Sequence, residues 1–473
     1  MRQCIALLLI ILIIYPAIAS VNQKLTDPTI QGSWEGAIEI MLTELIILVY
    51  FTMEDDTLRA TIDIPQQMAH NLPLSNLRYE NDTVYFELPA GPGLAVFDGA
   101  RDGDKISGKF SQAGMTGTFY LNRAEVKDEE IEEVPLLYNE EEVFIRNDNI
   151  RLGCTLTLPF TGAPHPAVIL ITGRGAQDRD ETIFGFKPFR ILADYLTPNG
   201  ISVLRCDDRG VGESTGNVFH ATAEDLAGDV VEKFRFLQAR KDIDPERIGL
   251  LGHSEEAIVA AIVAAWDEDV DFIISLAGPT VPGKELIVTQ SKLIFRAMEI
   301  DESVIEQQLR IFDLVYEAAE TGQGWDEIER IVREVVPAQV EQMTEEQRDA
   351  IVDLSQYIEH SISGTMFTLK SPWYQYLIRH DPSENWKRSN QPVLAVFGEL
   401  DLQVPSEMNK EAMKEALEYA GNEDFTLIVI SQANHLFQKA ETGLPSEYAQ
   451  LEKEFIDGFL DIILGWIKER VVS

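Results

Sequence analysis

The stretch IGLLGHSEEAIVAA, residues 248–261, decides the fold class of this chain. An apolar, strand-like run ends at Gly252, and a strong helix former begins at Glu255. Ser254 lies between them, at the apex of a sharp turn. A strained turn from a strand into a helix lifts a serine hydroxyl clear of the sheet and exposes it to a substrate. The pattern therefore predicts an α/β fold in which Ser254 is a nucleophile.

The usual pentapeptide of such a turn is G-x-S-x-G, and here the fifth position is Glu256. Glycine is usual there because the first helical turn packs tightly against the strands. A carboxylate in the first turn of a helix is electrostatically favourable, so we expect the difficulty to be steric. We expect Glu256 to bend outward or to push the turn open, which would slow the acylation step without preventing folding.

Composition limits the classes of partner. The 473 residues suggest two or three domains, and 45% hydrophobic residues can form a sizeable core. The formal net charge is −40, from 79 acidic and 39 basic side chains. Nucleic acids and anionic membrane surfaces would repel such a chain.

The first twenty residues, MRQCIALLLIILIIYPAIAS, resemble an export signal. The apolar run is shorter than the ~20 residues that a membrane-spanning helix needs, and a small-x-small pattern ends at Ala19. We expect residues 1–19 to be a signal peptide cleaved after Ala19, which makes the protein secreted or periplasmic, without a membrane anchor. Cys154 and Cys206 then remain, which allows one disulfide, but we expect two buried thiols because both lie in apolar runs.

The hydrophobic pattern divides the rest of the chain. Short alternating runs over residues 30–124 predict an antiparallel β domain, a barrel or a sandwich, that binds, positions or stabilises. An acidic linker follows at 125–142. Residues 143–281 and 386–473 read as one α/β domain, interrupted at 282–385 by helical spacing that suggests a cap over the site.

Helices and strands alternate in the α/β domain, which implies a mostly parallel sheet covered by helices. The predicted helices are 189–196, 222–239, 255–266, one from Glu407 and a closing amphipathic helix 447–470, and the predicted strands include 201–206, 247–252 and 271–276.

A serine nucleophile needs a histidine to take its proton and a carboxylate to orient that histidine. VFGELDLQVP places Asp401 in the turn after an apolar strand, and VISQANHLF places His435 in the turn after the next strand. The order Ser254, Asp401, His435 is that of α/β-hydrolases. Glu399, two residues before Asp401, is an alternative acid.

An acyl-transfer site also needs backbone N–H groups directed at the developing oxyanion. We expect one from Glu255 and the other from the glycine-rich loop TGRGAQDRDE, with Arg174 ahead of Gly175. His253 diverges from its neighbour on the turn and is a candidate for lining the substrate pocket.

Two further patterns concern binding. No cluster of histidine, cysteine and carboxylate has metal-ligand spacing, so we expect chemistry without a metal or another cofactor. The loop RCDDRGVGEST suggests an internal ion pair between Asp207 and Arg209 rather than a nucleotide site.

Taken together, several motifs resemble those of secreted bacterial α/β-hydrolases of the EstD-like esterase type, often described as serine aminopeptidase-like or S9-like. They are TGRGAQDRDETIFGFKPF, LRCDDRGVGESTG, DIDPERIGLLGHSE, LAGPTVPGKELI, SPWYQYLIRHDP, VFGELDLQVP and NHLFQKAETGLPSEY. The resemblance implies hydrolysis of carboxylic esters with short acyl chains, a helical cap, and Ser254, Asp401 and His435 as the catalytic residues. It also implies that Trp373 and Tyr374 lie near the entrance of the substrate pocket.

Three hypotheses follow from these patterns. The first is a serine carboxylesterase acting on a small-molecule ester; the second is a peptidase or acyl-peptide hydrolase with the same three residues. The third is a non-catalytic binding protein on a decayed hydrolase scaffold, which the unusual Glu256 favours. The patterns do not determine the natural substrate or the oligomeric state.

Overall fold

The computed structural model places most of the chain in two compact units. It describes residues 30–471 apart from 41–42, 55–56, 65–68, 90–93, 113–114, 125–135, 174, 268 and 343–353. The predicted signal peptide and most of the predicted linker lie outside the described residues. One unit combines the chain up to residue 132 with 313–371, and the other combines 133–312 with 372–473.

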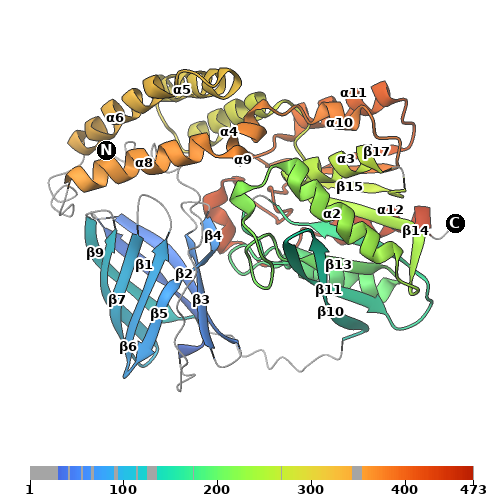
Figure 1. The fold of residues 1–473 in the computed structure, drawn as a ribbon, viewed down its shortest axis with the longest axis horizontal. Helices are drawn as coiled ribbons and strands as arrows, with labels where there is room; N and C mark the ends of the chain where they lie inside the picture. Colours follow the sequence, from blue (N-terminus) through green and yellow to red (C-terminus); the bar gives the residue numbers. More distant parts are fainter. Residues whose placement is uncertain are drawn as a thin grey trace. The chain divides into compact units, whose positions relative to one another are not determined.

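The N-terminal part of the first unit is a nine-stranded antiparallel sheet (Figure 1). Its order is β4-β3-β2-β1-β9-β8-β7-β6-β5. The strands are β1 (Gly32–Ile40), β2 (Thr43–Glu54), β3 (Thr57–Ile64), β4 (Ala69–Pro73), β5 (Ser75–Glu80), β6 (Thr83–Pro89), β7 (Leu94–Asp102), β8 (Lys105–Gln112) and β9 (Met115–Arg123).

The sheet curls into a barrel. Its two outermost strands, β4 and β5, are joined by Leu74 alone, and the Leu74 N–H donates to the Ala60 carbonyl of β3 at 2.9 Å. The interior is filled by apolar side chains, among them Phe86, Phe97 and Phe119, whose rings contact one another with centroids 4.5–5.9 Å apart. Such aromatic contacts add to the stabilisation from area burial.

The second unit contains an eight-stranded sheet ordered β10-β11-β13-β12-β14-β15-β16-β17. The first two strand pairs are antiparallel and the rest are parallel. The predicted α/β-hydrolase fold is confirmed. The strands are β10 (Tyr138–Asn147), β11 (Ile150–Pro159), β12 (His165–Ile171), β13 (Ser202–Cys206), β14 (Ile243–His253), β15 (Ile273–Leu276), β16 (Val393–Gly398) and β17 (Phe425–Ile430).

Helices cover both faces of this sheet. Along β12, Ala167 and Ile169 point into one core, with helices α2 (Ala223–Gln238), α3 (Glu256–Trp266) and α11 (Ser406–Ala420). Val168 and Leu170 point into the other core, with α1 (Pro188–Leu196) and α12 (Phe459–Val471). Both cores are apolar because successive residues of a strand face opposite sides of the sheet, and residues 167–171 of β12 are all apolar.

The described part of the region 282–385 consists of helices joined by short turns and loops, and the division between the two units falls within it. Its helices are α4 (Gly283–Ala297), α5 (Glu302–Thr321), α6 (Trp325–Gln342), α8 (Leu354–Lys370), α9 (Pro372–Arg379) and α10 (Ser383–Trp386).

Two element boundaries differ from the predictions. The closing helix begins at Phe459 rather than at residue 447, because the Ile456 N–H leaves the helical pattern and donates to the Phe437 carbonyl. Residues 138–142, predicted as linker, belong to β10 and pair with β11.

Cys154 and Cys206 form a disulfide, so the expectation of two free thiols is wrong. The two residues are directly opposite each other on the antiparallel strands β11 and β13, and both are buried. Close approach of Cβ atoms across paired strands brings the two sulfur atoms within bonding distance. The sequence placed both cysteines in strands but carried no information about the register of those strands.

We expect the double variant Cys154→Ala/Cys206→Ala to be less stable than the wild type by about 2–4 kcal/mol. The disulfide joins residues 52 positions apart, and its loss restores the freedom of that loop in the unfolded chain. Unfolding in guanidinium, followed by circular dichroism, measures the change. A reductant should lower the unfolding midpoint of the wild type but not that of the double variant; identical midpoints for the two proteins would contradict the prediction.

Candidate active site

Ser254 occupies a strained turn between β14 and α3. Its φ is +56°, in the left-handed region that non-glycine residues rarely adopt, and its N–H donates to the Leu276 carbonyl at 2.8 Å. Gly252 makes the close approach of the helix possible, since a Cβ there would lie 2.7 Å from the Cα of Ala257. The strain and the close packing are features of a nucleophile elbow.

His435 lies in the loop after β17 and contacts Ser254. Its Nε2 is 2.9 Å from Ser254 Oγ, and its Nδ1 is 2.7 Å from Asp401 Oδ2. The loop is shaped by the buried side chain of Asn434, whose Oδ1 accepts from the N–H groups of Leu436 and Gln438. The structure thus brings together three residues that are far apart in the sequence.

Asp401 is held in place by its own loop. Its Oδ1 accepts from the N–H groups of Gln403 and Val404, at 2.8 and 2.9 Å, which leaves Oδ2 for His435. The alternative acid, Glu399, is exposed and accepts instead from Ser431. Of the two carboxylates, Asp401 is therefore the one that orients the histidine.

Glu256 neither bends outward nor opens the turn. Its side chain is buried, and its Oε2 is without a hydrogen-bond partner. Burial, together with the nearby carboxyls of Glu255, Asp208 and Glu181, raises the pKa of Glu256 well above its ordinary value. The expectation that Glu256 bends outward is therefore wrong, and its burial carries the cost of removing a carboxyl from water. The expected slowing of acylation stays a prediction.

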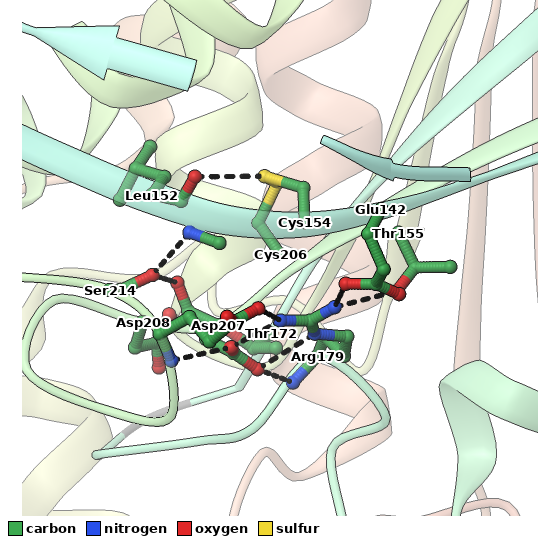
Figure 2. The surroundings of a disulfide bond; sticks show 12 residues. Glu142, Leu152, Cys154, Thr155, Thr172, Arg179, Cys206, Asp207, Asp208 and Ser214 are labelled. Carbon is green, nitrogen blue, oxygen red and sulfur yellow. Dashed lines mark hydrogen bonds and ion pairs between the residues drawn. A yellow bond between two sulfur atoms is a disulfide. The ribbon is translucent and has the colours of Figure 1, made fainter. Parts of the chain in front are cut away.

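The loop after β13 carries several ionisable side chains with little exposure to water. Figure 2 shows Arg179 directed at Asp207, with its Nη2 2.7 Å from Asp207 Oδ2. The predicted ion pair of Asp207 with Arg209 is wrong, since Arg209 binds Asp229 instead, with Nε 2.6 Å from Oδ2.

Burial raises the pKa of Asp208 to about 7, although Thr172 and the N–H of Gln177 donate to it.

The pocket and oxyanion candidates are placed as follows. Arg174 lies outside the described residues, and Gly175 has a φ of +107° in the same loop. Glu255 follows Ser254 directly, and its Oε1 accepts from the Trp373 indole N–H at 2.8 Å. Tyr374 contacts Trp373, with ring centroids 5.9 Å apart. Both aromatic residues are buried at the start of α9, and the hydrogen bond to Glu255 places Trp373 next to the nucleophile turn.

His253 is buried, and both of its ring nitrogens have partners within the protein. Neither nitrogen is available to a substrate. One partner is Glu181, the last residue of TGRGAQDRDE, to which the sequence motifs assigned no role. The acidic residues of that motif were a signal, but nothing in the sequence indicated that one of them turns inward.

Within the parts of the chain that the structure describes, no group of three or more histidine, cysteine or carboxylate side chains could hold a metal ion. None of the described helices is long and apolar enough to cross a membrane.

Comparisons with known proteins agree with the predicted resemblance. The model of the prolyl oligopeptidase family matches residues 343–461, a range that contains Asp401 and His435. Esterase EstD of Thermotoga maritima is 26% identical over 418 residues, which cover 87% of this chain and 85% of EstD. The thiohydrolase AneE of Aspergillus aculeatus is 32% identical over 140 residues, 29% of this chain and 41% of that protein.

Among solved structures, the Pyrococcus furiosus esterase Pf2001 aligns with a TM-score of 0.42 and 14% identity, covering 71% of this chain and 93% of that chain. Est1E of Butyrivibrio proteoclasticus aligns with a TM-score of 0.39 and 15% identity, covering 70% of this chain and 100% of that chain. The sequence comparisons confirm the predicted resemblance to EstD-like, S9-type esterases.

We expect Glu256→Gln to change how stability depends on pH. Because its pKa is raised in the folded chain, Glu256 should hold its proton to a higher pH there than in the unfolded chain, which releases it above about pH 4.3. Stability that depends on this proton is fully present below that pH and is lost as the pH rises toward the raised pKa of the folded state. Glutamine cannot ionise, so the difference in Tm between variant and wild type should grow in favour of the variant from about pH 4 to 8.

Thermal unfolding at a series of pH values measures this difference. Glu411→Gln, which changes an exposed carboxylate of α11, is the matched control for the loss of one acidic group. A Tm difference for Glu256→Gln that does not vary with pH would show that the buried carboxyl is not protonated in the folded state.

Proposed function

We propose that this serine hydrolase cleaves carboxylic esters through an acyl-enzyme on Ser254. The observation that carries the proposal is the continuous chain of hydrogen bonds from Ser254 through His435 to Asp401, at the ends of three parallel strands. A serine, a histidine and a buried carboxylate in this order are the requirements of nucleophilic acyl transfer.

In this proposal each of the three residues carries one step. Ser254 Oγ attacks the ester carbonyl while His435 Nε2 takes its proton, and Asp401 stabilises the imidazolium that forms. The tetrahedral intermediate collapses when His435 returns the proton to the leaving alcohol, which leaves an ester on Ser254. Water, activated by His435, then attacks that ester and releases the carboxylic acid together with the free serine.

Backbone amides complete the proposed site. The N–H of Glu255, at the start of α3, and that of Arg174 would face the developing oxyanion, where a donor contributes about 3–4 kcal/mol. We propose that helices of the region 282–385 cover the site, and that the acyl group is short. Two buried aromatic side chains support a restricted pocket: Trp373, which donates to Glu255, and its neighbour Tyr374.

A peptidase is the second candidate. The match to the prolyl oligopeptidase family favours it, as does the carboxylate of Glu255 immediately after the nucleophile. An exopeptidase needs an acidic group for the substrate ammonium, and Glu255 is the side chain that could supply one. The third hypothesis, a decayed binding protein, has no support in the site, because all three residues keep their hydrogen bonds.

We propose that the protein is exported, since a disulfide persists in oxidising compartments and is rare in the cytosol. N-terminal sequencing of protein recovered from the producing cells should give Ser20 as the first residue. A first residue upstream of Ser20 would contradict cleavage after Ala19.

We expect Ser254→Ala to abolish hydrolysis of short-chain p-nitrophenyl esters and labelling by a fluorophosphonate probe, because both reactions need the activated hydroxyl. Initial rates and gel fluorescence measure the two effects. The wild type should cleave these esters faster than aminoacyl p-nitroanilides, and a preference for the anilides would favour the peptidase. A wild type that is neither labelled nor active on either substrate would overturn the proposal.

Asp401 and Glu399 provide a matched pair of variants, one at the proposed acid and one at the neighbouring carboxylate. Asp401→Asn should lower kcat on the order of 10³–10⁴-fold, because an amide favours the wrong tautomer of the histidine. Glu399→Gln should leave kcat near the wild-type value, since Glu399 contacts Ser431 and not His435. Equal losses in the two variants would contradict the assignment of Asp401 as the acid.

A further inference from the structure

The ring of His253 lies between two acceptors on different segments. Its Nδ1 is 2.6 Å from Glu181 Oε1, and its Nε2 is 3.0 Å from the main-chain carbonyl oxygen of His435. The three residues are buried, with 1–5% of their surface exposed. Hydrogen bonds of this length in a water-poor site are strong, and they are costly to leave unmade.

Both bonds require His253 to donate. A main-chain carbonyl oxygen can only accept, so Nε2 must carry a proton. The Gly173 N–H also donates to Glu181 Oε1 at 2.6 Å, which favours the ionised form of Glu181. A carboxylate can only accept, so we infer that Nδ1 is the donor on the other side as well. A histidine that donates from both nitrogens is an imidazolium, which forms a buried ion pair with the Glu181 carboxylate.

The electrostatic surroundings support this charge state. Burial alone lowers the pKa of His253, but the Glu181 carboxylate outweighs it, and the pKa is raised above its ordinary value. The other ionisable groups facing the ring are Asp401, whose charge acts in the same direction, and the His435 ring, with its centroid 4.9 Å away. A small pocket with mostly apolar walls, including Leu276 and Phe437, borders the pair.

The pair formed by His253 and Glu181 connects three segments that take part in the proposed reaction. His253 precedes Ser254 at the end of β14, the carbonyl belongs to the histidine that serves as base, and Glu181 holds the N–H of Gly173. The packing around Gly173 is tight, since a Cβ there would lie 2.5 Å from Glu181 Oε1 and 2.9 Å from His253 Nδ1. The Gly173 amide is thus engaged by Glu181, next to the proposed oxyanion donor Arg174.

We propose that His253 and Glu181 are positioning residues that fix the base His435 and the loop starting at Gly173 relative to Ser254. The inference rests on the proposed function, because the segments it connects carry the nucleophile, the base and one oxyanion donor. His253 contacts neither substrate nor the reacting atoms; it acts through the main chain of His435 and through Glu181.

Three substitutions at His253 separate the two bonds. The amide nitrogen of glutamine can occupy the place of Nε2, so His253→Gln keeps a donor for the His435 carbonyl. The amide nitrogen of asparagine can occupy the place of Nδ1, so His253→Asn keeps a donor for Glu181. His253→Leu removes both donors.

We expect His253→Leu to lower kcat for ester hydrolysis by about 10- to 100-fold with little change in KM, because a misplaced base slows the chemical step rather than binding. His253→Gln should retain more of kcat than His253→Asn, since it keeps the bond to the loop of the base. Thermal unfolding of each variant confirms that the measured protein is folded. Folded variants that all keep the wild-type kcat would overturn the proposal.

His165→Gln is the matched control. His165 is also a buried histidine, but it lies at the start of β12, at the opposite end of the strand from the site. We expect this variant to change Tm without changing kcat. An equal loss of kcat in His165→Gln and His253→Gln would show that the effect comes from general destabilisation and would overturn the positioning role.

A second measurement does not depend on activity. In protein labelled with ¹⁵N-histidine, both ring nitrogens of His253 should carry protons at about pH 7, and Glu181→Gln should allow one of them to be lost. The N–H resonance of the bond between His435 and Asp401 should broaden or shift in His253→Leu. A neutral His253 in the wild type, or an unchanged resonance in the variant, would overturn the inference. If instead the wild type shows these signals but cleaves no ester, the failure lies with the proposed function.

Discussion

The left-handed turn at Ser254 is the constraint on which the rest of the site depends. A non-glycine residue with φ of +56° is strained, and the turn persists because its N–H is bound to the Leu276 carbonyl and because Gly252 lets α3 approach the strand. The parallel strands β14, β16 and β17 end at one edge of the sheet. Their following loops therefore bring Asp401 and His435 to the hydroxyl that the turn exposes.

Buried carboxyls surround this turn, and each is stabilised in a different way. Glu181 is paired with His253, and Asp208 accepts hydrogen bonds and has its pKa raised to about 7. Burial raises the pKa of Glu256 well above its ordinary value, and one of its oxygens has no hydrogen-bond partner. The chain has a formal net charge of −40, so acidic residues are common along it. Those at the site differ from the others because they are buried. Their surroundings decide which remain charged.

Residue patterns predicted most of the site because its parts follow apolar strands. Ser254, Asp401 and His435 each come after such a run, and their order identified the fold. The patterns missed Glu181, because a polar residue in a glycine-rich loop gives no sign of turning inward. They also gave the wrong state for Cys154 and Cys206, since pairing depends on the register of β11 and β13.

The sequence by itself determined the succession of strands and helices, the turn that carries Ser254 and the two residues that serve it. These are local signals, set by hydrophobic period and by the residues that follow each strand. Only the tertiary structure decided the disulfide, the pairing of His253 with Glu181 and the raised pKa of Glu256. Each of these depends on which distant side chains meet and how little water reaches them, and burial and long-range register are properties of the folded chain alone.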